Sequence, residues 1–269
     1  MNFVSGVLSV LLGLFSFGCE LFQDESNDGI SMDTVSTWIP IEGGYFDMGD
    51  EHVASAYPVH IVHVPTFNIT RTEITVAQYS ECVAAGGCTE PGMVNQQCNW
   101  NRSGLEQHPI NCVSWNQAVE FCRWFGGRLP SEAEWEFAAR AGGDNRTFPW
   151  GKNAPSCDYA VMVDSNGVSG CGSGGTWPVC SKPDGRTDHG LCDMGGNVYE
   201  WVQDHFHSSY DGYRASNGSA WEDVSNIYRV LRGAAFNAQK SDTLKVASRA
   251  NDTDTQQNEK YGIRCARDY

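Results

Sequence analysis

Positive charge is scarce in this chain of 269 residues. Its 18 Lys and Arg face 33 Asp and Glu, which gives a formal net charge of −15, and the first basic residue is Arg71. No cluster of basic residues occurs anywhere in the sequence. Recognition of nucleic acid, or of an anionic membrane surface, depends on such a cluster. The composition therefore argues against nucleic acid as a partner.

Several signatures of catalysis and metal binding are also missing. The sequence contains no Gly-rich phosphate loop and no G-x-S-x-G elbow, which argues against P-loop nucleotide binding and against an α/β-hydrolase. None of the 11 cysteines belongs to a Cys-x-x-Cys pair, which zinc sites commonly have. No internal repeat is present, and no apolar segment of membrane length follows residue 18.

The one long apolar run is residues 3–18, FVSGVLSVLLGLFSFG, which ends at Cys19. It is shorter than the roughly 20 residues of a membrane span and is typical of the apolar region of an export signal. Gly18, directly before Cys19, favours a lipoprotein signal in which Cys19 is lipidated. Because no Lys or Arg precedes the run, a plain signal peptide and a short membrane anchor remain as alternatives.

The segment after Cys19 turns polar and acidic, which predicts a flexible tether. The expected organisation is an export signal over residues 1–19, an acidic tether over 20–36 and a folded domain over 37–269. Contact with the membrane is expected through the N-terminal anchor only. The predicted location is the cell envelope, as a lipoprotein of the outer membrane or periplasm.

Setting Cys19 aside leaves ten cysteines, the even number that a disulfide framework in an exported protein requires. A family resemblance given below implies a pairing for Cys122 and Cys265. The eight other cysteines fall into two groups, and each group allows three internal pairings. Zinc binding by four clustered thiols is the alternative, but an exported domain favours disulfides. The groups are Cys82, Cys88, Cys98 and Cys112, and Cys157, Cys171, Cys180 and Cys192.

Regular secondary structure is predicted to be short and sparse. Three helices can be placed from capping boxes, in which a Ser or Thr and a Gln or Glu three residues later bond each other's free backbone N–H groups. The boxes begin at Thr75, Ser114 and Ser131, and they predict a helix over 76–84, one over 115–125, and a short amphipathic one that ends at Gly142-Gly143. Strands are expected at Tyr45–Met48, Val59–Val64, Val230–Gly233 and Gly262–Ala266.

Five segments, in order along the chain, resemble a known family. The longest is GRLPSEAEWEFAARAGGDNRTFPWG, residues 127–151, which resembles the signature of the formylglycine-generating enzymes, also called sulfatase-modifying factors. The likeness implies an α+β fold, a variant of the C-type lectin fold, with little regular secondary structure and many disulfides. One of these would join Cys122 to Cys265. The other segments are Ile39–Gly49, Pro109–Trp124, Asp193–Trp201 and Tyr261–Arg267.

The family's oxidase activity, which converts a substrate cysteine to formylglycine, uses two cysteines that bind Cu(I). Thiolates select this soft ion over harder ones. The two positions match Ala238 and Thr243 here, and no cysteine occurs between Cys192 and Cys265. Alanine offers no ligand and threonine a poor one, so neither copper nor formylglycine generation is expected. No catalytic residue is predicted, and the sequence favours a protein that is not an enzyme.

The resemblance also implies a structural calcium site. Carried over position by position, Asp193 and Glu200 would supply side-chain oxygens, and Gly196 and Val198 backbone carbonyls. Calcium prefers oxygen ligands, and a Gly-rich loop can turn several carbonyls inward. The alternative is that Glu200 pairs with an arginine and the loop holds no metal.

Histidines offer weaker candidates for metal binding. His205 and His207 follow Asp204, which places three potential ligands within four residues. His60 and His63 lie on an expected strand. A solvated polar loop and half-buried strand positions are the favoured interpretations.

Together these features favour an exported, lipid-anchored domain without oxidase activity that acts as a binding or scaffolding module at the cell envelope. Its partner would be an envelope protein, a peptide or a glycan. Two alternatives remain: an enzyme of the same family with divergent chemistry, and a regulator that binds sulfatase-type peptides without oxidising them.

Overall fold

The computed structural model describes residues 1–2, 38–213 and 216–269. The elements below all belong to one compact unit, Met32–Tyr269. Within the described residues, no helix is both long and apolar enough to cross a membrane. Cys19, the predicted tether and all but the first two residues of the predicted export signal lie outside the described residues.

In the described part of the chain, three α-helices begin where the capping boxes predict: α1 at Val76–Ala84, α2 at Trp115–Trp124 and α3 at Glu132–Ala139. All three boxes are confirmed, with both reciprocal hydrogen bonds present in each. An N-cap of this kind stabilises a helix by about 1 kcal/mol. Short 3-10 turns lie in the connections, at Ala54–Ala56, Gly170–Gly172, Pro183–Gly185 and Ser241–Leu244.

The third helix is buried on every side, so the prediction of an amphipathic helix is wrong. All eight of its residues are buried, including Glu132 and Glu136. Arg232 and Arg249 pair with Glu132, and Arg232 and Arg140 pair with Glu136. Buried carboxylates are tolerated when they are paired and hydrogen-bonded. These three arginines therefore let α3 occupy the core.

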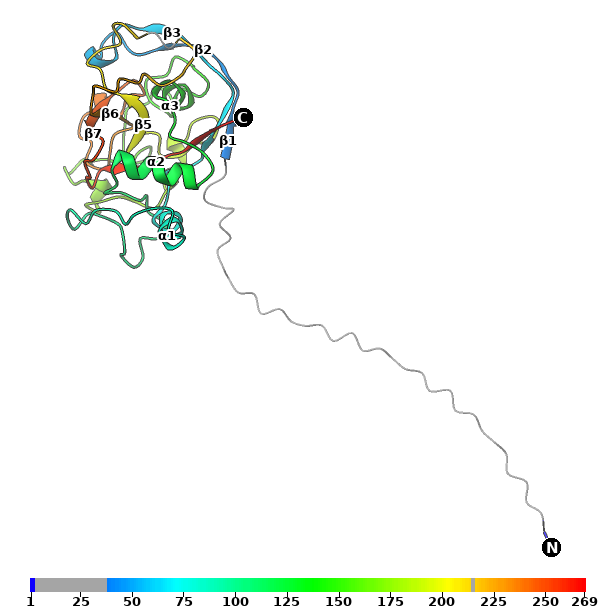
Figure 1. Ribbon diagram of the computed structural model, residues 1–269. Coiled ribbons are helices and arrows are strands. Elements are labelled where there is room, and N and C mark those ends of the chain that lie inside the picture. The colour runs from blue at the N-terminus through cyan, green and yellow to red at the C-terminus, as the bar shows by residue number, and fades with distance from the viewer. Residues whose placement is uncertain (3–37, 214–215) are drawn as a thin grey trace. The chain divides into compact units, whose positions relative to one another are not determined.

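The described residues form nine short strands in three sheets (Figure 1). Their orders are β1 (Trp38–Ile41), β4 (Phe67–Thr70) and β9 (Ala266–Asp268); β2 (Gly44–Met48) and β3 (His60–Val64); and β7 (Ala250–Thr253), β6 (Tyr228–Arg232), β5 (Tyr199–His205) and β8 (Tyr261–Gly262). Among these described strands, β5 and β8 are the only pair that runs in parallel. Helix α3 contacts both the β2–β3 pair and the β5–β6 pair, so it lies at the centre of the core.

Three of the four predicted strands are present with shifted ends, as β2, β3 and β6. The prediction of one strand over Gly262–Ala266 is wrong, because the chain leaves β5 after β8 and then pairs with β4 as β9. Between these two strands Arg264 bonds Glu200 and Cys265 bonds Cys122, all four being buried. These two contacts fix the chain in the core where a continuous strand would have run.

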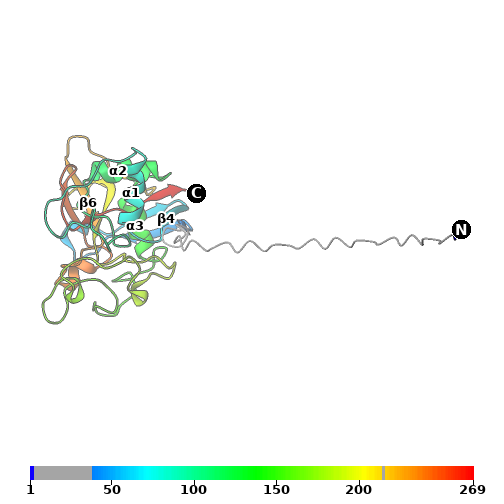
Figure 2. The same ribbon diagram turned by 90° about the horizontal axis from the view of Figure 1, so that it is seen from below.

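The last strand brings the C-terminal segment beside the N-terminal strands. In β4, Ile69 pairs with Ile39 of β1 on one side and with Ala266 of β9 on the other. Figure 2 shows the C-terminal arrow next to β4. The predicted Cys122–Cys265 disulfide is confirmed and fastens the same segment to α2. The expected α+β, disulfide-rich fold is confirmed as well.

Candidate functional site

The loop from Asp193 to Val198 leads into β5 and is buried at every position. Asp193 and Asn197 have left-handed backbones, with φ of 57° and 64°. A non-glycine residue holds this conformation when its surroundings fix it. The Cys180 backbone N–H donates to Asp193 Oδ2 at 2.6 Å, and the Trp177 N–H donates to Asn197 Oδ1 at 3.0 Å. The loop is therefore held against segment 177–180.

Glu73 is a buried carboxylate at this loop that the sequence analysis missed. Asn197 Nδ2 donates to Glu73 Oε2 at 2.6 Å, and the Val198 N–H donates to Oε1 at 3.1 Å. Burial, together with the charges of Asp193 and Glu200, raises the pKa of Glu73 well above its ordinary value. Burial also raises the pKa of Asp193 to about 6. No local pattern around Glu73 in the sequence distinguishes it from an exposed glutamate.

Arg264 is the cation that faces these carboxylates, and it is fully buried. Its Nε donates to both oxygens of Glu200 at 2.9 Å, and its Nη2 donates to Oε1 at 2.8 Å. Trp135 Nε1 on α3 donates to Glu200 Oε2 at 2.5 Å. The remaining N–H groups of Arg264 reach the carbonyls of Thr70 and Cys192, both at 2.7 Å. One guanidinium thus joins β4, β5 and the disulfide-bonded segment.

The predicted calcium ligands do not fit this arrangement. The oxygens of Glu200 already accept four contacts from Arg264 and Trp135, which uses the lone pairs that a cation would need. Asp193 and the carbonyls of Gly196 and Val198 would then provide three oxygens, whereas calcium takes six to eight.

The alternative stated from the sequence, Glu200 paired with an arginine, is what the structure contains. In the described ranges no group of three or more His, Cys, Asp or Glu side chains could hold a metal ion. Calcium stays a prediction. Thermal unfolding in excess calcium and in chelator tests it: calcium binding to the folded state would raise the unfolding temperature.

The two positions that match the copper cysteines lie in apolar or backbone-bonded surroundings. Ala238 is buried in a cluster that includes Phe148, Met162 and Leu244. The Thr243 hydroxyl donates to the Lys240 carbonyl at 2.7 Å. Neither side chain is a soft ligand of the kind that Cu(I) prefers.

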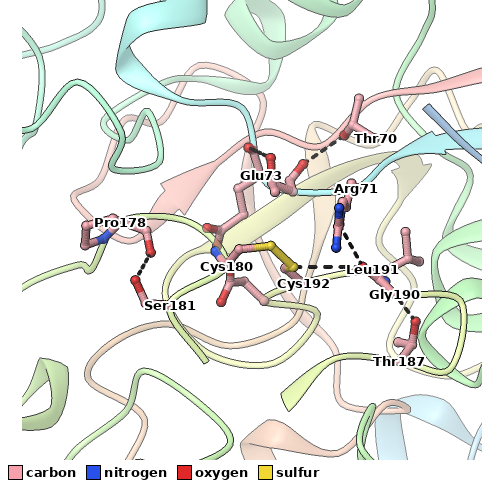
Figure 3. Close-up of a disulfide and its surroundings, with 12 residues drawn as sticks. Thr70, Arg71, Glu73, Pro178, Cys180, Ser181, Thr187, Gly190, Leu191 and Cys192 are labelled. Atoms are coloured by element: carbon pink, nitrogen blue, oxygen red, sulfur yellow. Dashed lines mark hydrogen bonds between the residues drawn. A yellow bond between two sulfur atoms is a disulfide. The ribbon is translucent and has the colours of Figure 1, made fainter. Parts of the chain in front are cut away.

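All ten cysteines of the described residues are paired in disulfides. Each group of four resolves into sequential neighbours, which leaves no thiol in the described residues for zinc. Figure 3 shows the Cys180–Cys192 bond, with the Arg71 side chain directed at the Gly190 carbonyl. Arg71 Nε donates to that carbonyl at 3.3 Å, which ties the bonded segment to β4's end. The pairs are Cys82–Cys88, Cys98–Cys112, Cys157–Cys171 and Cys180–Cys192.

The segment from Asp204 to His207 is not a solvated loop, because Asp204 and His205 are buried at the end of β5. Asp204 accepts the backbone N–H of Glu132 at 2.6 Å and that of Trp221 at 2.7 Å. The His207 ring stacks on Trp221 with 3.6 Å between centroids. These side chains join α3 to the 216–222 loop and do not converge on a metal position.

Asp204 makes the stability of the domain depend on pH. Burial, with the charge of Glu132, raises the pKa of Asp204 from 3.8 to about 7. Between these two pKa values the folded state keeps a proton on Asp204 that the unfolded state has lost. The stabilisation that comes from this proton is complete below the pKa of Asp204 in the unfolded state. It is lost as the pH rises through the pKa of Asp204 in the folded state. We expect Asp204 to lower the unfolding free energy by up to about 1.4 kcal/mol per pH unit in that window.

Urea unfolding across the window measures this slope. Asp204→Asn should flatten the fall of the unfolding free energy with pH, although it also loses one backbone acceptor. The exposed Asp211→Asn is the matched control and should keep the wild-type slope. An unchanged slope in Asp204→Asn would contradict the assignment.

The family described as "Sulfatase-modifying factor enzyme 1-like domain" matches residues 26–269. The formylglycine-generating enzyme of Bos taurus is 34% identical, and the alignment covers 86% of this chain and 74% of that enzyme. The serine/threonine-protein kinase Pkn1 of Chlamydia trachomatis is 33% identical, and the alignment covers 87% of this chain and 38% of the kinase. The chain therefore spans well under half the length of that relative.

A solved structure gives the same result. PvdO from Pseudomonas aeruginosa has a TM-score of 0.72 to this chain at 28% identity, and the likeness covers 86% of this chain and 94% of PvdO. The resemblance seen in the five sequence segments is thereby confirmed. The chain belongs to the family of sulfatase-modifying factor enzyme 1-like domains.

Proposed function

We propose that this domain is an exported binding or scaffolding module of the cell envelope that does not oxidise cysteine. The observation that carries the proposal is that every cysteine of the described residues is in a disulfide. Oxidation by the mechanism of the formylglycine-generating enzymes needs two free thiolates on the protein to bind Cu(I). Ala238 and Thr243 occupy the two matching positions.

The five disulfides also indicate an oxidising compartment outside the cytoplasm. The apolar run that ends at Cys19 supports export and a lipid anchor. A partner in the envelope, whether a protein, a peptide or a glycan, is consistent with a domain that is tethered there. Its strongly negative charge supports a partner other than nucleic acid.

The proposal predicts a protein without usable thiols and without aldehyde product. Titration with Ellman's reagent in denaturant, without reductant, should detect no thiol from the domain over residues 38–269. Incubation with Cu(I), oxygen and a Cys-x-Pro-x-Arg peptide should leave the peptide mass unchanged, while an active formylglycine-generating enzyme run in parallel converts it. Tight uptake of Cu(I), or conversion of the peptide cysteine to an aldehyde, would refute the proposal.

The same peptide separates the module from a regulator of sulfatase maturation. Immobilised Cys-x-Pro-x-Arg peptide should retain no more of the protein than a control peptide in which Ser replaces Cys. Selective retention without conversion would instead identify the regulator. A divergent enzyme would be identified by product formation from envelope extract that boiling of the protein abolishes.

A further inference from the structure

A cleft of about 310 Å³ lies between the 96–108 segment and the 173–176 loop. Both walls are fixed by disulfides close to them, Cys98–Cys112 on one side and Cys157–Cys171 on the other. Gln97 Nε2 donates to the Gly174 carbonyl at 2.8 Å across the cleft's edge. A pocket whose walls are already held in place binds a ligand at a smaller entropic cost.

Buried polar side chains form the floor of the cleft. The Asn99 side chain, only 3% exposed, donates through Nδ2 to the Pro109 carbonyl at 2.8 Å and to Thr176 Oγ1 at 2.9 Å. Thr176 Oγ1 also bonds His108 Nδ1 at 2.9 Å. Both amide protons of Asn99 are thus used, and Asn99 Oδ1 is left without a partner among the described residues. This buried residue therefore offers an acceptor to a ligand in the cleft.

The charge of the lining is unusual for so acidic a chain. Among the described residues no Asp or Glu lines the cleft, and the exposed Arg102 is its only charged lining residue. Arg102 Nη1 donates to the Gln96 carbonyl, and within the described residues no carboxylate forms an ion pair with this guanidinium. Burial and the nearby Arg102 charge lower the pKa of His108, so its ring is neutral near pH 7. The cleft combines neutral donors and acceptors with one unpaired positive charge.

We propose that this cleft binds an acidic sugar, with the ring hydroxyls on the amide and hydroxyl side chains of the floor and the carboxylate on Arg102. Amide and hydroxyl groups both donate and accept, as hydroxyl groups of a sugar require. The planar guanidinium of Arg102 matches a carboxylate in a bidentate pair. The volume is at the lower end of ligand pockets and suits a single sugar ring.

A protein or peptide ligand is less well supported by the same lining. No strand contributes to the cleft, so an extended peptide finds no sheet edge to pair with. Among the described residues that line the cleft, Leu105 is the one apolar aliphatic side chain, His108 is the one ring, and no Phe, Tyr or Trp is present. Anchors of protein interfaces are mostly aromatic residues or arginines in well-packed pockets. The polar floor instead favours a ligand that carries many hydroxyl groups.

The proposal gives a ligand class to the binding role proposed above, and it rests on that role. Saturation-transfer NMR with the full chain and D-glucuronate as the probe tests it, with D-glucose as the uncharged comparison. We expect glucuronate to bind with a dissociation constant of about 1 mM and at least about tenfold more tightly than glucose. Arg102→Leu should remove that tenfold preference, whereas the exposed Arg123→Leu on α2 should leave it unchanged.

A second variant blocks the cleft without disturbing the fold. A Cβ at Gly175 would meet no atom within 4 Å, so Gly175→Leu adds bulk in open space beside Thr176. It should abolish the transfer signal of both sugars while the unfolding temperature stays near that of the wild type. No signal for glucuronate, equal binding of glucose and glucuronate, or full binding by Gly175→Leu would each overturn the proposal. The thiol and aldehyde assays report on the absence of oxidase activity separately.

Discussion

Replacing Cys122 and Cys265 together by alanine is expected to lower the free energy of unfolding by about 5 kcal/mol. This disulfide has the largest sequence separation of the five, 143 residues. In the chain-entropy model, a longer loop removes more freedom from the unfolded chain when it is closed. Because a domain is stable by only about 5–15 kcal/mol, this loss would leave little margin. Urea unfolding of the wild type and the double variant measures it.

The Cys82–Cys88 bond is the matched control, because it also begins on a helix but has a sequence separation of only 6 residues. The same model gives about 2 kcal/mol for its removal. Cys82→Ala/Cys88→Ala should therefore be the milder double variant by about 3 kcal/mol. Equal losses for the two pairs would show that local packing, and not loop closure, determines the stabilisation.

Arg264→Met should destabilise the domain by about 3–5 kcal/mol, because it leaves a buried carboxylate without its cation. Arg264 and Glu200 are both fully buried, and the shortest N–O distance between them is 2.8 Å. Methionine keeps most of the volume of the arginine stem, so the change reports chiefly on the charge. The measurement is again the free energy of unfolding, with circular dichroism to confirm that the variant still folds.

Two further variants separate pairing from simple loss of packing. Arg264→Met/Glu200→Gln removes both charges and should regain a substantial part of the stability lost by Arg264→Met alone. Arg267→Met, at an exposed position three residues along, should cost about 1 kcal/mol or less. If the double variant were less stable than Arg264→Met, the ion pair would not be the cause.

The helices could be placed from sequence because their starting signals are local. Each capping box involves two residues three positions apart, and all three boxes form as predicted. The burial of α3 could not be predicted in this way. Its Glu132 and Glu136 look like the polar face of a surface helix until Arg232 and Arg249, about a hundred residues later, are known to reach them. Long-range charge pairing overrode the local pattern.

At the candidate site, too, features with a local sequence signal could be predicted, and features that depend on long-range contacts could not. The loop that begins at Asp193 was found because its sequence resembles a family motif. Glu73 was missed because its partners, Asn197 and Val198, follow more than 120 residues later. The partner of Glu200 could only be named as an arginine, since the sequence does not show that Arg264 crosses to it. Cysteine pairing stayed open within each group because four cysteines allow three pairings and no sequence signal distinguishes them.

The position of β9 has a consequence for how the protein is made. Residues 266–268 complete a sheet begun by Trp38–Ile41 and Phe67–Thr70. The N-terminal strands are synthesised long before β9. Until synthesis has passed residue 268, the edge of β4 that pairs with β9 therefore has no partner strand. The N-terminal part of the domain thus cannot complete this sheet without the C-terminal part. A nascent chain halted before β9 would leave the edge of β4 open to pairing with strands of other chains.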